Sequence, residues 1–236
     1  MDYTVNHMGD STVVIEFGKT IDHKVHEHVQ QVFSFFEKQS PDWMIECIPA
    51  FTTVAILYDP VKVYSHTKKA LPHETVTDYI KDTLRNISTL QPAEGRKIEI
   101  PVCYGGEFGP DLAFVAEHNS LTQDEVIRIH SGTEYLVYMI GFAPGFPYIG
   151  GMSEKIAAPR KDTPRAKIPA GSVGIAGNQT GIYPIETPGG WQLIGQTPLP
   201  LFQPESESPS LLKAGDMITF KPITAEQFKD EKEKRP

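Results

Sequence analysis

The stretch from residue 141 to residue 200 restricts the fold of this chain more than any other feature. It holds 11 glycines and 9 prolines in 60 residues, so one residue in three disfavours a regular helix. Such density is common in disordered chains. Apolar residues nevertheless recur throughout it, among them Phe142, Ile168, Val173 and Trp191. Short strands that are joined by tight turns and closed into a barrel explain both features, so we predict a mainly-β domain here.

The first 89 residues show a different pattern, in which strand and helix periods follow one another. Two-residue alternation and β-branched runs predict strands at 3–9, 12–17, 43–48 and 52–58. We interpret Asp59-Pro60 as a turn that closes the last strand pair. Apolar residues at helical spacing predict helices over 22–38 and 75–88. We therefore expect a small α+β domain, with two helices on one side of an antiparallel sheet.

Composition sets the remaining boundaries. Residues 90–96 contain Pro and Gly without periodicity, which is typical of a linker between domains. The barrel domain is expected over 97–224. Residues 225–236 carry mixed charge, and we expect a solvated or frayed tail.

The barrel domain is expected to open with one strand and two helices. The strand covers 97–104, and a helix over 111–118 would take Asp111 as its N-cap. A second helix begins at Thr122, because Thr122 and Glu125 have the spacing of a reciprocal capping box.

Charge and hydropathy exclude several classes of partner. The net charge of −8 disfavours nucleic acid, since an acidic chain repels phosphate backbones. No run of eighteen apolar residues predicts a membrane span, and the first residues do not resemble a signal peptide. We expect a soluble cytoplasmic protein.

Familiar catalytic and metal motifs do not occur in the sequence. There is no Gly-rich phosphate loop ending in Gly-Lys-Ser/Thr, and Ser172 narrowly misses the nucleophile-elbow pattern. His23, His26 and His28 lack accompanying ligands, so we expect a solvated helix face and no metal. The sequence leaves the catalytic groups unknown.

Three segments of the barrel carry the candidate binding residues. In the first, residues 141–149, prolines and glycines hold aromatic rings in an irregular but stiff loop, which suits a contact surface. The alternative is that the rings fill the barrel. The candidates are Phe142, Pro144, Phe146 and Tyr148.

The second segment, residues 159–169, is basic within an acidic chain. Arg160 and Arg165 lie there with Lys161 and Lys167, between prolines. Such a cluster can bind a carboxylate, a phosphate or an acidic partner. The alternative is an ordinary solvated loop, in which Arg165 only braces its own segment.

The third segment, residues 171–183, combines glycines with Gln179, Thr180 and Tyr183. Glycines allow close backbone approach to a ligand, although strand turns require them equally. We expect Arg165, Gln179 and Tyr183 to line one pocket. It would take a small carboxylated or amide substrate, or a proline-containing loop of a partner.

Four motifs together identify a family resemblance. They are the runs Tyr104–Leu112, Gly141–Tyr148, Pro169–Pro184 and Pro188–Trp191. With them the chain resembles the allophanate hydrolase subunit 1 family, whose members are largely B subunits of bacterial 5-oxoprolinase. The resemblance implies a cyclophilin-like C-terminal barrel.

The resemblance also implies two activities. One is a share in the ATP-dependent opening of 5-oxoproline to glutamate, together with A and C subunits, with ATP bound by the assembled complex. Since the sequence shows no nucleophile–base set and no phosphate loop, we expect this chain alone to be inactive. The other is inhibition of autophosphorylation of a sporulation sensor histidine kinase by direct binding, with the C subunit as antagonist. The alternative is a carboxyltransferase-type domain, as in urea carboxylase, or a prolyl-isomerase-like binding domain.

Overall fold

The computed structural model describes residues 2–20, 22–68, 71–87 and 95–234, apart from the side chain of His23. The chain divides into two compact units, Met1–Glu94 and Gly95–Pro236. Residues 90–94 of the predicted linker lie outside the described residues. Arg96 is part of the second unit, where its Nε donates a hydrogen bond to Asp216 Oδ1 at 2.9 Å. Within these ranges, no helix has the length and apolarity needed to cross a membrane.

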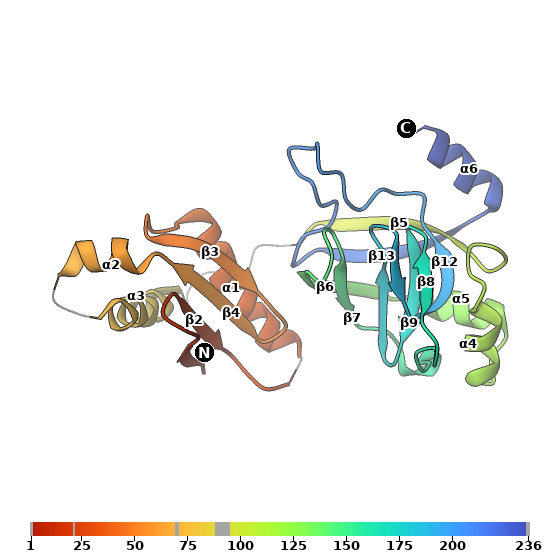
Figure 1. The fold of residues 1–236 in the computed structure, drawn as a ribbon. Helices are drawn as coiled ribbons and strands as arrows, with labels where there is room; N and C mark the ends of the chain where they lie inside the picture. Colours follow the sequence, from red (N-terminus) through yellow and green to blue (C-terminus); the bar gives the residue numbers. More distant parts are fainter. Residues whose placement is uncertain (1, 21, 69–70, 88–94, 235–236) are drawn as a thin grey trace. The chain divides into compact units, whose positions relative to one another are not determined.

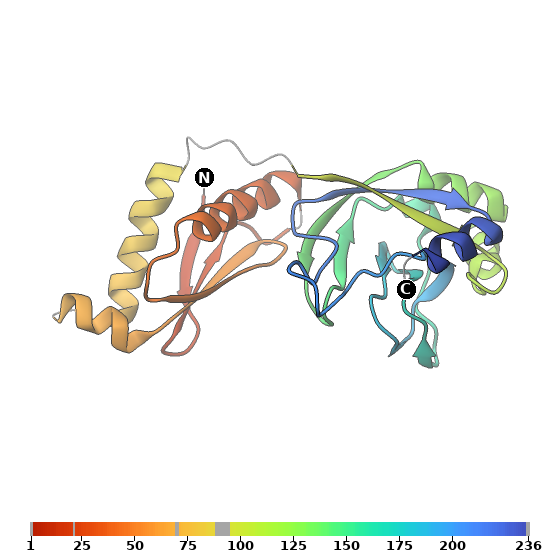
Figure 2. The same cartoon turned by 90° about the horizontal axis from the view of Figure 1, so that it is seen from above.

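The first unit is the expected antiparallel sheet with helices on one face (Figure 1). Its strands, in the spatial order β1-β2-β4-β3, are β1 (Thr4–His7), β2 (Thr12–Glu16), β4 (Thr53–Tyr58) and β3 (Met44–Pro49). Helices α1 (His23–Lys38) and α3 (Pro72–Ile87) cover the sheet and bury Val13, Ile15 and Ile56 (Figure 2).

This unit has a third helix that the sequence pattern did not predict. Helix α2 (Pro60–Thr67) starts where Asp59-Pro60 was interpreted as a turn that closes a strand pair. One carboxylate oxygen of Asp59 accepts the N–H groups of Val61 and Lys62, at 2.9 and 3.2 Å. Asp as an N-cap followed by Pro at the first helical position is also a helix-start signal, and here that interpretation is correct.

The prediction of a solvated histidine face on α1 is wrong for His26. Its side chain is only 2% exposed. Residues 26 and 29 are three apart, so they share a helix face, and Val29 is fully buried in the core. His28 is half-buried.

The second unit is built around a closed seven-stranded barrel (Figure 1). Its spatial order is β10-β7-β6-β13-β5-β12-β9, and within it β5 and β13 run parallel. The barrel strands are β5 (Lys97–Tyr104), β6 (Glu134–Ile140), β7 (Pro147–Gly150), β9 (Ser172–Ala176), β10 (Gln179–Ile182), β12 (Gln192–Gln196) and β13 (Met217–Ile223). A separate two-stranded sheet joins β8 (Arg165–Ile168) and β11 (Thr187–Gly189).

The Gly/Pro-rich segment therefore forms short strands, as its composition predicts. Strands β9 and β10 show how the turns are made: they pair antiparallel, and Gly177 and Asn178 connect them. Gly177 has φ +57°, a left-handed conformation that glycine adopts without strain.

Among the described residues, three α-helices and one short 3₁₀-helix accompany the barrel: α4 (Leu112–His118), α5 (Gln123–Ser131), α6 (Ala225–Glu233) and η1 (Glu154–Ile156). The capping box of α5 is confirmed. Thr122 Oγ1 accepts the N–H of Glu125, and Glu125 Oε2 accepts the N–H of Thr122. Asp111 does occupy the N-cap position of α4, but its side chain makes no capping hydrogen bond.

The charged C-terminal segment forms a helix, which the expectation of a frayed tail did not foresee. Thr224 and Gln227 make a second capping box at the start of α6. Phe228 is buried, with its ring 4.6 Å from that of Phe108 between centroids. A single aromatic anchor and a good cap thus order a segment whose other side chains are mostly charged.

A buried histidine forms the polar centre of the barrel interior. His130 Nδ1 lies 2.8 Å from the Tyr104 hydroxyl, and its Nε2 lies 2.8 Å from Thr180 Oγ1. The Thr180 hydroxyl donates to the carbonyl of Gly174, so Nε2–H donates to Thr180 and Nδ1 accepts from Tyr104. Burial lowers the pKa of His130 to about 3, and the ring is neutral at physiological pH.

This histidine should make the stability of the second unit depend on pH. In the unfolded chain the ring binds a proton below its ordinary pKa of 6.5, whereas in the native barrel it stays neutral down to about pH 3. Stability is therefore complete above pH 6.5 and falls by about 1.4 kcal/mol for each pH unit below it.

We expect His130→Gln to lose this contribution to the slope between pH 7.5 and pH 5. The measurement is urea unfolding followed by Trp191 fluorescence, in a Trp43→Phe background that leaves one of the two tryptophans. His118→Gln, at an exposed position, is the control and should keep the parental slope. Equal slopes for both variants would contradict the assignment.

Candidate functional site

A pocket of about 190 Å³ opens on the second unit beside the barrel. The residues that line it come from the aromatic loop before β7, the basic segment before β8, strand β10, and the turns around β11. They are Phe142, Phe146, Tyr148, Arg160, Gln179, Tyr183, Pro188, Gly189, Gly190 and Trp191.

The aromatic loop owes its rigidity to two consecutive tight turns. The N–H of Ala143 donates to the carbonyl of Gly141 at 2.8 Å, which closes a three-residue γ-turn around Phe142. The N–H of Phe146 then donates to the carbonyl of Ala143, and the turn between them contains Pro144 and Gly145. Gly145 has φ +77°, the conformation that a type II turn requires after proline. Pro144 therefore shapes the loop and does not line the pocket.

Phe146 is the centre of the aromatic wall. Its ring is 4% exposed and makes edge-to-face contacts with four other rings. The centroid distances are 5.4 Å to Phe142 and to Tyr148, 5.8 Å to Tyr183 and 6.1 Å to Trp191. The aromatic rings were expected either to form a contact surface or to fill the interior, and the two residues differ in this respect. Phe146 is buried in the interior, whereas Phe142, at 73% exposure, faces solvent.

Phe142 has a backbone conformation that is unusual for its residue type. Its φ is +68°, in the left-handed region where a non-glycine residue costs about 1 kcal/mol or more. We expect Phe142→Gly to be more stable than Phe142→Ala by about 1 kcal/mol, since both lack the ring but only alanine keeps the strain. Urea unfolding of the two variants measures the difference. Equal stabilities would show that the turn is unstrained.

Close packing requires glycine at position 189. A β-carbon there would lie 2.5 Å from the Tyr183 hydroxyl and 2.8 Å from Ile168 Cδ1. The backbone of β11 therefore passes directly against the phenol that lines the pocket. This position has a specific steric reason for glycine beyond general turn composition.

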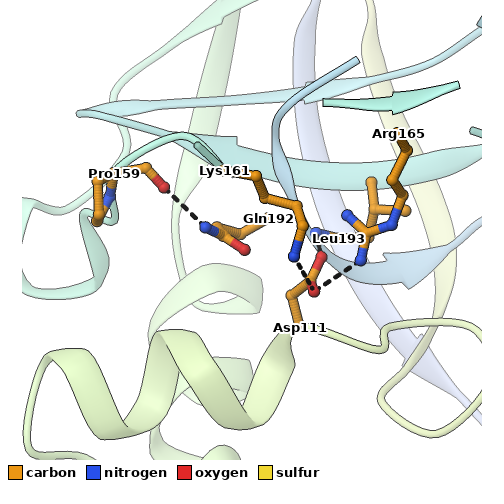
Figure 3. Close-up of polar contacts among 6 residues, drawn as sticks. All are labelled: Asp111, Pro159, Lys161, Arg165, Gln192 and Leu193. Carbon is orange, nitrogen blue, oxygen red and sulfur yellow. Dashed lines mark hydrogen bonds and ion pairs between the residues drawn. The ribbon is translucent and has the colours of Figure 1, made fainter. Parts of the chain in front are cut away.

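Asp111 holds the basic segment against β12, as Figure 3 shows. Its Oδ1 pairs with Arg165 Nη2 at 2.7 Å and with Lys161 Nζ at 3.5 Å. Its Oδ2 accepts the backbone N–H of Leu193 at 2.7 Å. Burial alone would raise the pKa of Asp111, but the hydrogen bonds and the two cations outweigh it and hold the pKa below its ordinary value.

The prediction that Arg165, Gln179 and Tyr183 line one pocket is wrong for Arg165. Gln179 and Tyr183 line the pocket, but Arg165 does not, because its guanidinium serves the nearly buried Asp111. A buried carboxylate must be paired, and this demand fixes Arg165 as a brace. Arg160, also a candidate, lines the pocket instead.

Thr180 also lies apart from the pocket. Successive side chains of a strand point to opposite faces, so Gln179 faces the pocket while Thr180 faces the barrel interior and His130. The sequence pattern did not single out Trp191, Gly189 or Asp111 as site residues. The run Gly189-Gly190-Trp191, a tryptophan after two glycines, could have pointed to Trp191 and Gly189. No local sequence pattern marks the role of Asp111.

The groups that line the pocket are suited to ligand recognition. Burial raises the pKa of Tyr183, although the backbone N–H of Trp191 and the charges of Arg160 and Arg165 act in the opposite direction. The phenol is therefore protonated at neutral pH. No Ser, Cys, His, Asp or Glu is among the described residues that line the pocket. A cation, an amide, a phenol and aromatic faces remain for ligand recognition.

Comparison with known proteins identifies the family. The model of the carboxyltransferase domain, subdomain C and D, matches residues 3–212. The chain belongs to this family. The resemblance to 5-oxoprolinase B subunits is also confirmed: the B subunit of 5-oxoprolinase from Bacillus subtilis is 51% identical over 233 residues, which cover 98% of this chain and 97% of that protein.

Two solved structures are similar to this chain. Protein PH0987 from Pyrococcus horikoshii is 45% identical with a TM-score of 0.56, over 95% of this chain and 100% of that one. TTHA0988 is 30% identical with a TM-score of 0.75, over 91% of this chain. This chain spans only 40% of TTHA0988, which is therefore the longer protein.

Proposed function

We propose that this chain is the B subunit of an ATP-dependent 5-oxoprolinase, which opens 5-oxoproline to glutamate together with A and C subunits. The observation that carries the proposal is the 51% identity along almost the whole length of a protein with that name. The pocket supports it chemically. Its aromatic walls suit a small ring, and Gln179 and Arg160 can bind an amide and a carboxylate, both of which 5-oxoproline contains.

The composition of the pocket explains why partners are needed. Its lining holds no nucleophile–base pair among the described residues, so this pocket can bind and orient a substrate but does not itself supply a nucleophile for lactam hydrolysis. Arg160 is the single cation of that lining, too little charge for a triphosphate. We therefore assign ATP to the assembled complex.

Reconstitution tests this proposal. Purified chain alone, A and C subunits without it, and all three together are each supplied with ATP and 5-oxoproline, and glutamate is measured. We expect sustained glutamate formation only from the three-subunit mixture. Glutamate from the single chain, or equal rates with and without it, would contradict the proposal.

A second activity, inhibition of a sensor histidine kinase by direct binding, is favoured by one observation. Phe142 presents a 73% exposed ring on a stiff turn, as anchors of protein interfaces do. Phe142→Gly should then weaken inhibition of kinase autophosphorylation at least about thirty-fold, the equivalent of about 2 kcal/mol. Adding the C subunit should relieve inhibition by the parental chain. Undiminished inhibition by Phe142→Gly would remove this support.

A further inference from the structure

Three of the four basic side chains between residues 159 and 169 already have carboxylate partners. Arg165 and Lys161 pair with Asp111 at 2.7 and 3.5 Å. Lys167 Nζ lies 3.0 Å from Glu186 Oε1. Each of these three cations thus already has a carboxylate counter-ion, and the Lys167–Glu186 pair is exposed to solvent.

Arg160 differs from the other three. It lines the pocket, and within the described parts of the chain no carboxylate forms an ion pair with it. An exposed cation on a wall of aromatic rings is available to an anionic ligand. The other charged groups of the segment do not neutralise it.

The backbone on both sides of Arg160 is fixed to the same stretch of chain. Gln192 Nε2 donates to the carbonyl of Pro159 at 2.9 Å, as Figure 3 shows. The N–H of Lys161 donates to the carbonyl of Gly190 at 2.7 Å. Gly190 and its neighbour Trp191 are themselves part of the pocket wall. The backbone that carries Arg160 and the pocket wall are therefore positioned together before any ligand binds, which lowers the entropic cost of binding.

The surroundings of Arg160 define the ligand that it can take. Tyr148, Tyr183 and Trp191 provide ring faces, and Gln179 provides one amide. The cavity of about 190 Å³ admits a compact molecule with one small ring. A guanidinium binds a carboxylate through two parallel hydrogen bonds, a geometry that an uncharged lactam cannot use.

We propose that Arg160 is the specificity-determining residue of this pocket: it binds the carboxylate of a small cyclic amide and so selects the acid over the uncharged lactam. The proposal rests on the proposed function and identifies the Arg160 guanidinium as the group that determines substrate specificity. It assigns Asp111, Gln192 and Gly190 the task of positioning that group.

Equilibrium binding to the three-subunit complex tests it. The probes are 5-oxoproline and 2-pyrrolidinone, which has the same lactam ring without the carboxylate. We expect Arg160→Ala to weaken 5-oxoproline binding about ten- to hundred-fold, the value of a hydrogen-bonded charged group, with little effect on 2-pyrrolidinone. Arg160→Lys should give an intermediate loss, because charge remains but the fork does not.

Lys167→Ala is the matched control, since it removes a neighbouring cation that does not line the pocket. It should bind both probes as the parent does, and thermal melting should be unchanged in all variants because Arg160 and Lys167 are both exposed. Equal affinities of the parental and Arg160→Ala complexes for 5-oxoproline would overturn this inference and leave the proposed function standing. A parental complex that neither binds nor turns over 5-oxoproline would overturn both.

Discussion

Asp111→Ala is expected to lower the free energy of unfolding of the second unit by about 3 kcal/mol. The carboxylate side chain is 9% exposed and is hydrogen-bonded to Arg165 and to the backbone of Leu193. Removing one member of a buried ion pair leaves the other charge desolvated and unpaired, which costs about 3 to 5 kcal/mol. Arg165 retains 26% exposure, so we expect the lower end of that range.

Two further variants separate the charge from the hydrogen bond. Asp111→Asn keeps an oxygen for the Leu193 N–H but loses the charge, so it should lose about half as much stability. Asp162→Ala removes an exposed carboxylate from the same segment and should change stability by less than about 0.5 kcal/mol. Urea unfolding in the Trp43→Phe background measures all three. A loss below about 1 kcal/mol for Asp111→Ala would mean that the contacts of Asp111 with Arg165 and Leu193 do not stabilise the second unit.

Phe146→Ala is expected to destabilise the second unit by about 3 to 5 kcal/mol, the usual cost of truncating a buried phenylalanine. The ring is 4% exposed and contacts four other aromatic rings, so its removal leaves a cavity behind the pocket wall. Any loss of ligand or partner binding by this variant therefore reports collapse of the wall as well as loss of a contact.

Phe142→Ala is the matched comparison on the same loop. Its ring is mostly solvent-exposed, so truncation should cost less than about 1 kcal/mol. Phe146→Leu, which keeps most of the buried volume, should recover much of the stability that alanine loses. Similar unfolding midpoints for Phe146→Ala and Phe142→Ala would contradict the division between a buried ring and an exposed one.

Those elements of the fold that depend on local sequence were predictable. The strand at 97–104 has the predicted bounds, and the capping box at Thr122 forms as expected. The interpretation of Asp59-Pro60 as a turn was wrong because the same two residues suit both a turn and a helix start. The expectation of a frayed tail was wrong because helix α6 is ordered by the packing of Phe228 against Phe108. These two residues lie far apart in the sequence.

The residues of the candidate site likewise fall into those that local sequence predicts and those that depend on contacts between distant segments. Phe142, Phe146 and Tyr148 follow from one local run, and strand alternation could have separated Gln179 from Thr180. The choice between Arg160 and Arg165 could not be made from the sequence. It depends on Asp111, which lies 54 residues before Arg165 and becomes its partner only in the folded barrel.

The most direct test of the pocket as the working site of this protein is kcat/KM for 5-oxoproline with Gln179→Leu in the three-subunit complex. Leucine keeps the approximate size but removes the amide from the pocket wall. Gln203→Leu, at an exposed position outside the pocket lining, is the control. We predict a fall of about ten-fold for Gln179→Leu, with unchanged thermal stability and parental kcat/KM for the control. A value for Gln179→Leu within about two-fold of the parent would contradict the account.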